Sequence, residues 1–193
     1  MAKAYDRLEW GFLYKIMERM GFSDTWIHLT KSCVEGCWFS VLLNGEATAS
    51  LSRPEGFVKG THYLLFLFVS ATEYFARSLD HLFRQNSKMY YSMKSKIKAS
   101  HLAYADDTIF TSAWRPGLVK LMATIAKYEA LSGQLVNIDK SSFIVAKSMP
   151  LLVIQCIKNV IGFMMKHLPI TYLGAPLYTG NKKASLFTLL CNR

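Results

Sequence analysis

Two adjacent aspartates, Asp106 and Asp107, are the side chains of this sequence best suited to chemistry. The mainly apolar residues on either side, His101–Tyr104 and Thr108–Phe110, predict two strands joined by a tight turn. Neighbouring side chains of a regular strand point to opposite faces, so adjacent carboxylates can share a site only in a turn. Hard oxygen ligands held there suit Mg²⁺, which takes one or two carboxylates together with substrate phosphates. An ordinary polar hairpin turn would use the same residues.

A second candidate is the segment His81–Ala105, which contains no acidic residue. Its cations alternate with Tyr90 and Tyr91, and lysines among aromatic residues suit phosphate contact combined with base stacking. A solvated basic linker accounts equally well for this composition. The cations are Arg84, Lys88, Lys94, Lys96 and Lys98.

Helical and extended patterns alternate along the chain without regular βαβ units, which predicts an α+β fold with a mainly antiparallel sheet. Asn44-Gly45 is a strong hairpin signal, and glycines at 21 and 133 are expected to end helices. The expected helices cover residues 8–20, 23–34, 62–83, 116–131 and 150–161. The expected extended segments cover residues 37–43, 47–51, 101–104, 108–112, 136–146 and 171–177.

The composition favours an intracellular chain with an anionic partner. Of its 193 residues 51% are hydrophobic, which supports a packed core. The net charge of +10 favours a polyanionic partner, either nucleic acid or an anionic membrane, and an excess of solvated lysines explains it equally well. No secretory signal is visible, and the most apolar run, Tyr63–Ala71, is too short to span a membrane. We therefore expect a nuclear or cytoplasmic protein without a membrane partner. Buried thiols are expected at Cys33, Cys37, Cys156 and Cys191.

Four segments resemble, in the same order, motifs of the reverse transcriptases of LINE-type (non-LTR) retrotransposons, especially those of plants. The aspartate turn lies in LAYADDTIF, similar to the family's hydrophobic-Ala-Asp-Asp signature. A single four-residue motif is a weak signal, but four in family order are a strong one. The segments are residues 3–10 (KAYDRLEW), 102–110 (LAYADDTIF), 133–141 (GQLVNIDKS) and 168–177 (LPITYLGAPL).

The resemblance implies the palm of an RNA-directed DNA polymerase, an antiparallel sheet flanked by helices. In that family an RNA template, a DNA primer and a deoxynucleoside triphosphate meet at two Mg²⁺ ions held by carboxylates from separate strands. It implies that Asp106 and Asp107 are catalytic metal ligands and that Leu173-Gly174 grips the primer terminus. Tyr5 would lie under the nucleotide sugar, and Lys140 lies in the segment with a candidate proton donor to pyrophosphate.

The departures from the family pattern predict an inactive fragment. The first catalytic aspartate aligns one residue before Met1, and Asp6 is too far along the chain to replace it. In the nucleotide-pocket motif the spacing of Gly56 and Gly60 survives, but Lys59 replaces Gln and residues 61–65 replace D-P-L-S-P. We retain Lys59 and Gly60 as candidate nucleotide-binding residues.

We expect a truncated palm over residues 1–180 and a frayed tail over 181–193, with fingers and thumb largely missing. No obligate protein partner is evident. Poor solubility is expected, because apolar surface around the Trp10 helix and the Leu67-Phe68 helix would lose its cover. Three readings remain open: an inactive palm fragment, a chain active in trans or with a misassigned start codon, and a non-catalytic basic nucleic-acid-binding module.

Overall fold

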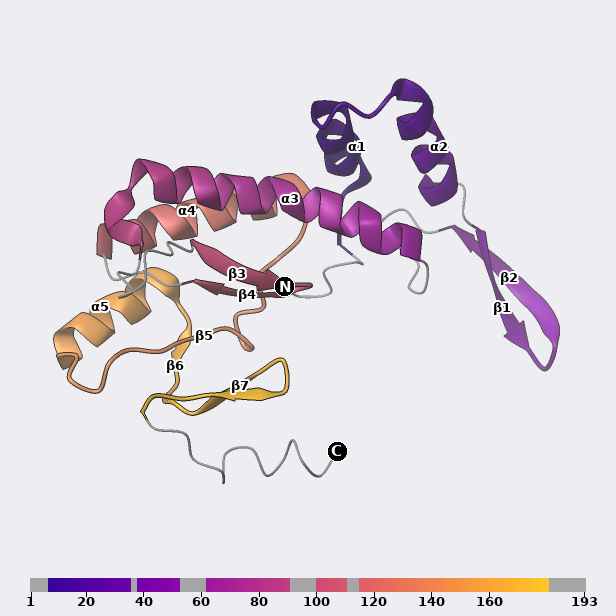
Figure 1. Ribbon diagram of the computed structural model, residues 1–193. Coiled ribbons are helices and arrows are strands. Elements are labelled where there is room, and N and C mark those ends of the chain that lie inside the picture. Colours follow the sequence, from indigo (N-terminus) through magenta and orange to yellow (C-terminus); the bar gives the residue numbers. More distant parts are fainter. Residues whose placement is uncertain (1–6, 36–37, 53–61, 91–99, 111–114, 181–193) are drawn as a thin grey trace. The chain divides into compact units, whose positions relative to one another are not determined.

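The computed structural model describes residues 7–35, 38–52, 62–90, 100–110 and 115–180. Internal contacts divide the chain into two compact units, Met1–Val136 and Asn137–Arg193, and each is described by itself. Helices and short strand pairs occur in both (Figure 1), so the predicted α+β class is confirmed. The strands of the described residues form four separate two-stranded pairs rather than one continuous sheet.

Four α-helices of the first unit form where the apolar spacing predicts them, with ends displaced by at most a few residues. A short 3₁₀ turn, η1 (Ser87–Met89), follows the third helix inside the basic segment His81–Ala105. The helices are α1 (Trp10–Arg19), α2 (Asp24–Glu35), α3 (His62–Gln85) and α4 (Arg115–Ser132).

The end of α1 shows why Gly21 is a glycine. Its φ of 84° lies in the left-handed region, which side chains with a Cβ rarely adopt. The Gly21 N–H donates to the Glu18 carbonyl at 3.0 Å, and the Phe22 N–H donates to the Met17 carbonyl at 3.1 Å. This pair of bonds is the Schellman motif, which satisfies carbonyls that the helix end leaves without partners.

The core of the first unit lies among α1, α3 and α4. Phe75 of α3 stacks on Tyr128 of α4 with ring centroids 4.5 Å apart, and Phe12 of α1 meets the Tyr128 ring edge-on at 6.0 Å. Such aromatic pairs stabilise the core beyond the free energy that is gained by burying the rings. The buried apolar cluster comprises Leu8, Phe12, Leu13, Ile16, Met17, Val34, Leu67, Ala71, Phe75, Leu79, Phe83, Met89, Leu121, Ile125 and Tyr128.

A buried polar network closes the end of α4. The Tyr128 hydroxyl donates to Gln134 Oε1, and the Ser132 hydroxyl donates to the Tyr128 carbonyl at 2.7 Å. Burial raises the pKa of the Tyr128 hydroxyl well above the ordinary tyrosine value. The same end receives the start of the chain, because the Glu9 N–H donates to the Ser132 carbonyl at 2.9 Å.

Two antiparallel hairpins belong to the first unit. Strands β1 (Trp38–Leu43) and β2 (Glu46–Ser52) are joined by Asn44 and Gly45. Those two residues have φ values of 54° and 87°, and positive values at both central positions are typical of a type I′ turn. The predicted Asn-Gly hairpin is therefore confirmed. The second hairpin joins β3 (His101–Tyr104) to β4 (Asp107–Phe110).

The second unit contains a βαβ crossover that was not predicted. Strand β5 (Ser142–Phe143) pairs in parallel with β6 (Met164–Met165), and α5 (Leu151–Ile161) lies between them in sequence. Parallel strands need such a crossover. The expected extended segment 136–146 is mostly wrong, since only two of its residues form β5 and residues 138–140 turn. Asn137 stabilises that turn by accepting the Lys140 N–H at 3.1 Å.

The end of the second unit is a tight hairpin rather than the single extended piece expected over 171–177. Strand β7 (Ile170–Tyr172) pairs antiparallel with β8 (Ala175–Leu177). The turn residues Leu173 and Gly174 have φ values of 50° and 81°. This turn was not predicted, because Leu is an uncommon residue in the left-handed region.

One expectation about exposure is wrong. Cys33 is exposed and Cys156 is partly buried, so the prediction of buried thiols is wrong for Cys33. Exposed apolar surface is present on the Leu67-Phe68 helix, as expected: Leu67 and Phe68 are buried, and their neighbours Leu65, Phe66 and Val69 are exposed. Cys37 and Cys191 have no described side chain. Within the described ranges, none of the helices combines the length and apolar character that crossing a membrane requires.

Candidate functional site

The paired aspartates lie at the turn of the β3–β4 hairpin. Tyr104 pairs with Asp107, so the loop between the strands consists of Ala105 and Asp106 alone. Ala105 has a φ of 50°, which allows the chain to reverse within two residues. The sequence placed Asp107 in the turn, but the structure makes it the first residue of β4. Both aspartates are exposed.

Helix α3 positions the open end of this hairpin. At the start of β3, the Ser100 hydroxyl lies 2.5 Å from Asp80 Oδ1 of α3 and 2.9 Å from His101 Nδ1. At the end of β4, the Phe110 ring meets the Phe75 ring of α3 edge-on at 6.4 Å. His101 and Phe110 are partners in the strand register, so both contacts act on the same end. The turn with the aspartates is the opposite end of the hairpin.

The donor chemistry of the turn suits Mg²⁺, which prefers carboxylate oxygens. The number of ligands is smaller than a dedicated site provides. Among the described residues, no group of three or more His, Cys, Asp or Glu side chains is placed to hold a metal ion. The turn therefore contributes two adjacent carboxylates, and substrate phosphates or water would complete the coordination of a bound Mg²⁺.

Three other predicted site residues belong to the second unit. Lys140 is exposed at the end of the turn that Asn137 stabilises, and its backbone N–H donates to Asn137 Oδ1. Leu173, with 52% of its surface exposed, and Gly174 form the tip of the β7–β8 hairpin. A tight, exposed tip suits contact with a large ligand. These residues belong to the second unit, whereas the aspartates belong to the first.

Of the predicted basic residues, two are described. Arg84 is exposed near the end of α3, and Lys88 is exposed in η1. The described start of the basic segment is therefore helical, in α3 and η1. The remaining predicted residues lie outside the described ranges; they are Tyr5, Lys59, Gly60, Lys94, Lys96 and Lys98.

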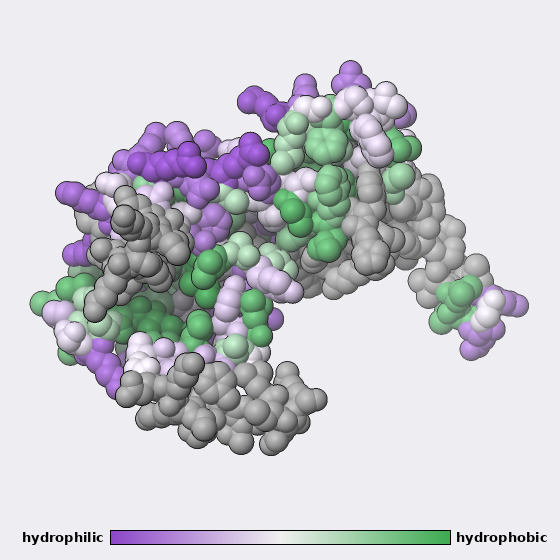
Figure 2. Space-filling model, viewed as in Figure 1, coloured by the Kyte–Doolittle hydropathy of each residue, from purple (hydrophilic) through white to green (hydrophobic). Residues whose placement is uncertain are grey.

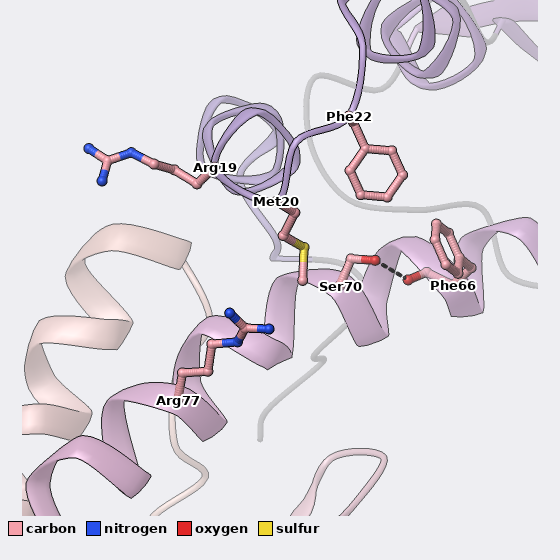
Figure 3. A pocket seen from close by; sticks show the side chains of 6 residues that line it. All are labelled: Arg19, Met20, Phe22, Phe66, Ser70 and Arg77. Atoms are coloured by element: carbon pink, nitrogen blue, oxygen red, sulfur yellow. Dashed lines mark hydrogen bonds between the residues drawn. The ribbon is translucent and has the colours of Figure 1, made fainter.

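An open cleft beside α3 was not predicted. It has a volume of about 410 Å³ and lies between the end of α1 and α3 (Figure 3). The helical spacing of Phe66, Ser70 and Arg77 would have indicated a shared face, because residues four and eleven positions apart lie on one side of a helix. The lining residues are Arg19, Met20, Phe22, Phe66, Ser70 and Arg77.

Comparison with known proteins assigns the family. The sequence model of the family described as reverse transcriptase (RNA-dependent DNA polymerase) matches residues 1–177. A comparison with curated proteins gives no match. The match includes every described element and extends over both aspartates of the β3–β4 turn. The chain belongs to the reverse transcriptase family.

Proposed function

We propose that this chain is the palm region of a reverse transcriptase from a plant LINE-type (non-LTR) retrotransposon. The parent activity is template-directed DNA synthesis on RNA. The observation that carries the proposal is the two-residue turn with adjacent exposed carboxylates, inside a family match over residues 1–177. The four ordered motifs at 3–10, 102–110, 133–141 and 168–177 support the finer assignment to LINE-type elements.

Each proposed site residue has a chemical task. Asp106 and Asp107 would hold Mg²⁺, which when bound neutralises charge on the phosphates of nucleotide and primer. Lys140 is proposed to place a cation near the leaving pyrophosphate, and Tyr5 to contact the nucleotide sugar. Leu173 and Gly174 would hold the primer end. Lys59 and Gly60 belong to the altered nucleotide-pocket segment and would contact the nucleotide weakly.

We further propose that a polypeptide of residues 1–193 does not polymerise nucleotides by itself. The proposal rests on Lys59 at the family's Gln position and on the replacement of D-P-L-S-P by residues 61–65. Two adjacent carboxylates alone do not fix an in-line geometry, and misplacement by about 1 Å can cost a hundredfold in rate.

Primer extension on an RNA template with Mg²⁺ tests this proposal. We expect no template-dependent product from the 193-residue polypeptide, and none from Asp106→Asn. A product that Asp106→Asn abolishes would overturn the proposed inactivity.

A metal titration tests the site without requiring turnover. Mg²⁺ should shift the amide resonances of Ala105–Asp107 in NMR spectra, and Asp106→Asn/Asp107→Asn should remove the shifts. Asp139→Asn is a matched control, since Asp139 is an exposed aspartate of the second unit. Equal shifts in the double variant would mean that the turn is an ordinary polar turn.

The second candidate function is a non-catalytic nucleic-acid-binding module that uses the segment from Arg84 to Lys98. The exposure of Arg84 and Lys88 favours it. RNA binding should weaken steeply with salt and be lost when Lys94, Lys96 and Lys98 become Gln. Binding that is absent, or independent of salt, would end this proposal.

A further inference from the structure

The β3–β4 hairpin presents different side chains on its two faces. Residues that lie opposite each other in an antiparallel pair share a face, and successive residues alternate between the faces. One face therefore carries His101, Ala103, Thr108 and Phe110, and the other carries Leu102, Tyr104, Asp107 and Ile109. The face with His101 and Phe110 contacts α3. Asp107 consequently lies on the opposite face, beside the exposed Tyr104.

The face on which Asp107 lies depends on the register of the two strands. A shift by one residue moves every side chain of one strand to the other face. His101 and Phe110 would then lie on opposite faces, and only one of them could contact α3. If His101 kept its place, Asp107 would turn toward α3. The local sequence defines this register weakly, because both strands are mainly apolar and Ala105-Asp106 is not one of the glycine-containing pairs that fix a two-residue turn.

A serine bridges α3 and the start of β3. Ser100 Oγ lies 2.5 Å from Asp80 Oδ1 and 2.9 Å from His101 Nδ1, and the last two atoms are 4.0 Å apart. An ionised carboxylate can only accept, so the Ser100 hydroxyl donates its one proton to Asp80. Its oxygen then accepts from Nδ1–H of His101. Because Ser100 is buried, water competes little for these bonds.

Hydrophobicity alone would favour the other orientation of β3. Leu102 has 60% of its surface exposed, whereas only 12% of the polar His101 side chain is exposed. Turning the strand over would bury the leucine, which the burial of apolar surface favours. The bonds of Ser100 therefore hold β3 against this preference. Their acceptor, Asp80, is half exposed, and Figure 2 shows hydrophilic side chains gathered over α3 and α4.

We propose that Asp80, Ser100 and His101 are positioning residues of the metal site. The serine bridge selects the orientation of β3, and the aromatic contact of β4 with α3 then selects the register. Together they keep Asp107 on the face away from α3. All three residues act through the hairpin and are not metal ligands. Their role in metal binding rests on the proposed function, whereas the register is measured without metal.

Cross-strand NOEs of the isotope-labelled full chain measure the register. Ala103 and Thr108 are partners, so the strongest cross-strand NOE of Ala103 should be to Thr108 in the wild type. A shift by one residue would pair Ala103 with Asp107 or Ile109 instead. Loss of a hydrogen bond to a charged group shifts an equilibrium roughly tenfold or more, so Ser100→Ala should populate a shifted register. Ser100→Thr, which keeps the hydroxyl, should restore the wild-type pattern.

Two controls separate the bridge from a general loosening of the fold. Ser78→Ala removes a serine bond within α3, from the Ser78 hydroxyl to the Tyr74 carbonyl at 2.8 Å, and should leave the register unchanged. Asp80→Ala removes the acceptor at a half-exposed position of the helix and should act like Ser100→Ala. Unchanged NOEs in both Ser100→Ala and Asp80→Ala would overturn the proposal. An equal change in Ser78→Ala would overturn it as well.

A Mg²⁺ titration links the register to the metal site. The apparent affinity of a site is reduced by the fraction of molecules in the competent state. The Mg²⁺ concentration at half-maximal shift of the Ala105–Asp107 amides should therefore rise several-fold in Ser100→Ala, but not in Ser100→Thr or Ser78→Ala. An unchanged midpoint beside a shifted register would overturn the role in metal binding. A wild type without any Mg²⁺ response would contradict the proposed function, and the NOEs would still decide the role of the bridge.

The His101 ring provides an independent signature of the bridge. As a donor to Ser100 Oγ, Nδ1 must carry a proton whether the ring is neutral or cationic. The ¹⁵N chemical shifts of the two ring nitrogens measure this directly in the wild-type chain. A ring with an unprotonated Nδ1 would show that the serine donates to the histidine instead of to Asp80, and would overturn the bridge.

Discussion

Helix α5 is more apolar than helix α3, yet α3 is the more buried of the two. Eight of the eleven residues of α5 are apolar, yet none is buried, and Leu152 keeps 82% of its surface exposed. Helix α3 carries more charged residues, but it buries Leu67, Phe68 and Leu79 almost completely. The difference lies in their neighbours, because α3 contacts both α1 and α4. Burial follows from the elements that pack against a helix, and apolar composition alone does not provide it.

The largest contrast should come from replacing one leucine of each helix by alanine. Leu79→Ala removes a fully buried side chain of α3 and should lower the free energy of unfolding by about 3–5 kcal/mol. Leu152→Ala in α5 should change stability by less than about 0.5 kcal/mol. All four tryptophans belong to the first unit, so fluorescence during urea unfolding measures the first effect, and hydrogen exchange of α5 amides measures the second. A loss above about 2 kcal/mol for Leu152→Ala would show that α5 is covered.

A matched pair of glycines sharpens the same comparison. Gly133 and Gly162 follow α4 and α5, and both have a φ of 71°. A Cβ on Gly133 would lie 2.5 Å from the Arg7 carbonyl oxygen, whereas one on Gly162 meets nothing within 4 Å. Gly162→Ala should therefore cost only the backbone strain of about 1–2 kcal/mol, and Gly133→Ala about 2–4 kcal/mol. Equal losses in urea unfolding of the two units would show that packing around Gly133 relaxes freely.

The buried Tyr128 predicts a smaller effect with a distinct pH dependence. Tyr128→Phe removes one hydrogen bond to the fully buried Gln134 and should cost about 1–2 kcal/mol at neutral pH. Tyr104→Phe, at an exposed hydroxyl, is the control.

Burial raises the pKa of Tyr128, so the unfolded chain loses this proton at lower pH than the folded chain. The stabilising contribution of the protonated hydroxyl is therefore complete below about pH 10, the ordinary value, and declines by about 1.4 kcal/mol per pH unit above it. As the pH rises, the wild type should lose this contribution to its free energy of unfolding, and Tyr128→Phe should not. Parallel pH profiles of the two proteins would contradict the assignment.

The smallest effect on stability is expected from surface leucines of α5, whose main consequence should be on solubility. Leu151 and Leu152 are exposed by 84% and 82%. Leu151→Gln/Leu152→Gln should leave the unfolding of the first unit unchanged and raise the concentration at which the chain stays monodisperse in light scattering. A wild-type chain that is already a monodisperse monomer would contradict the prediction of poor solubility.

Local sequence signals predicted the local structure well. Asn44-Gly45, Gly21 and the apolar spacing of the helices act through neighbouring residues, and the turns and helices they predict are present. The β5–α5–β6 crossover was missed because two-residue strands carry too little pattern, and parallel pairing depends on residues far apart in sequence. The β7–β8 turn was missed because Leu173 supplies no turn signal.

The part of the candidate site that depends on neighbouring residues was predictable, and the part that depends on helix packing was not. The aspartate turn follows from two apolar strands and a polar pair, so its position was found within one residue. The cleft at Phe22 and Phe66 depends on packing between α1 and α3, which no local pattern indicates. The roles of Asp106, Asp107, Lys140, Leu173 and Gly174 stay predictions.

The hydrogen bond from Glu9 to Ser132 has a consequence for biosynthesis. Its two residues are 123 positions apart, so at ribosomal rates of about 5–20 residues per second the nascent α1 waits roughly 6–25 seconds for its partner. During this interval Phe12, Leu13 and Met17 lack the α4 part of their core. A chaperone that binds apolar segments would have its best opportunity then, and synonymous codons that slow translation before residue 132 would lengthen it.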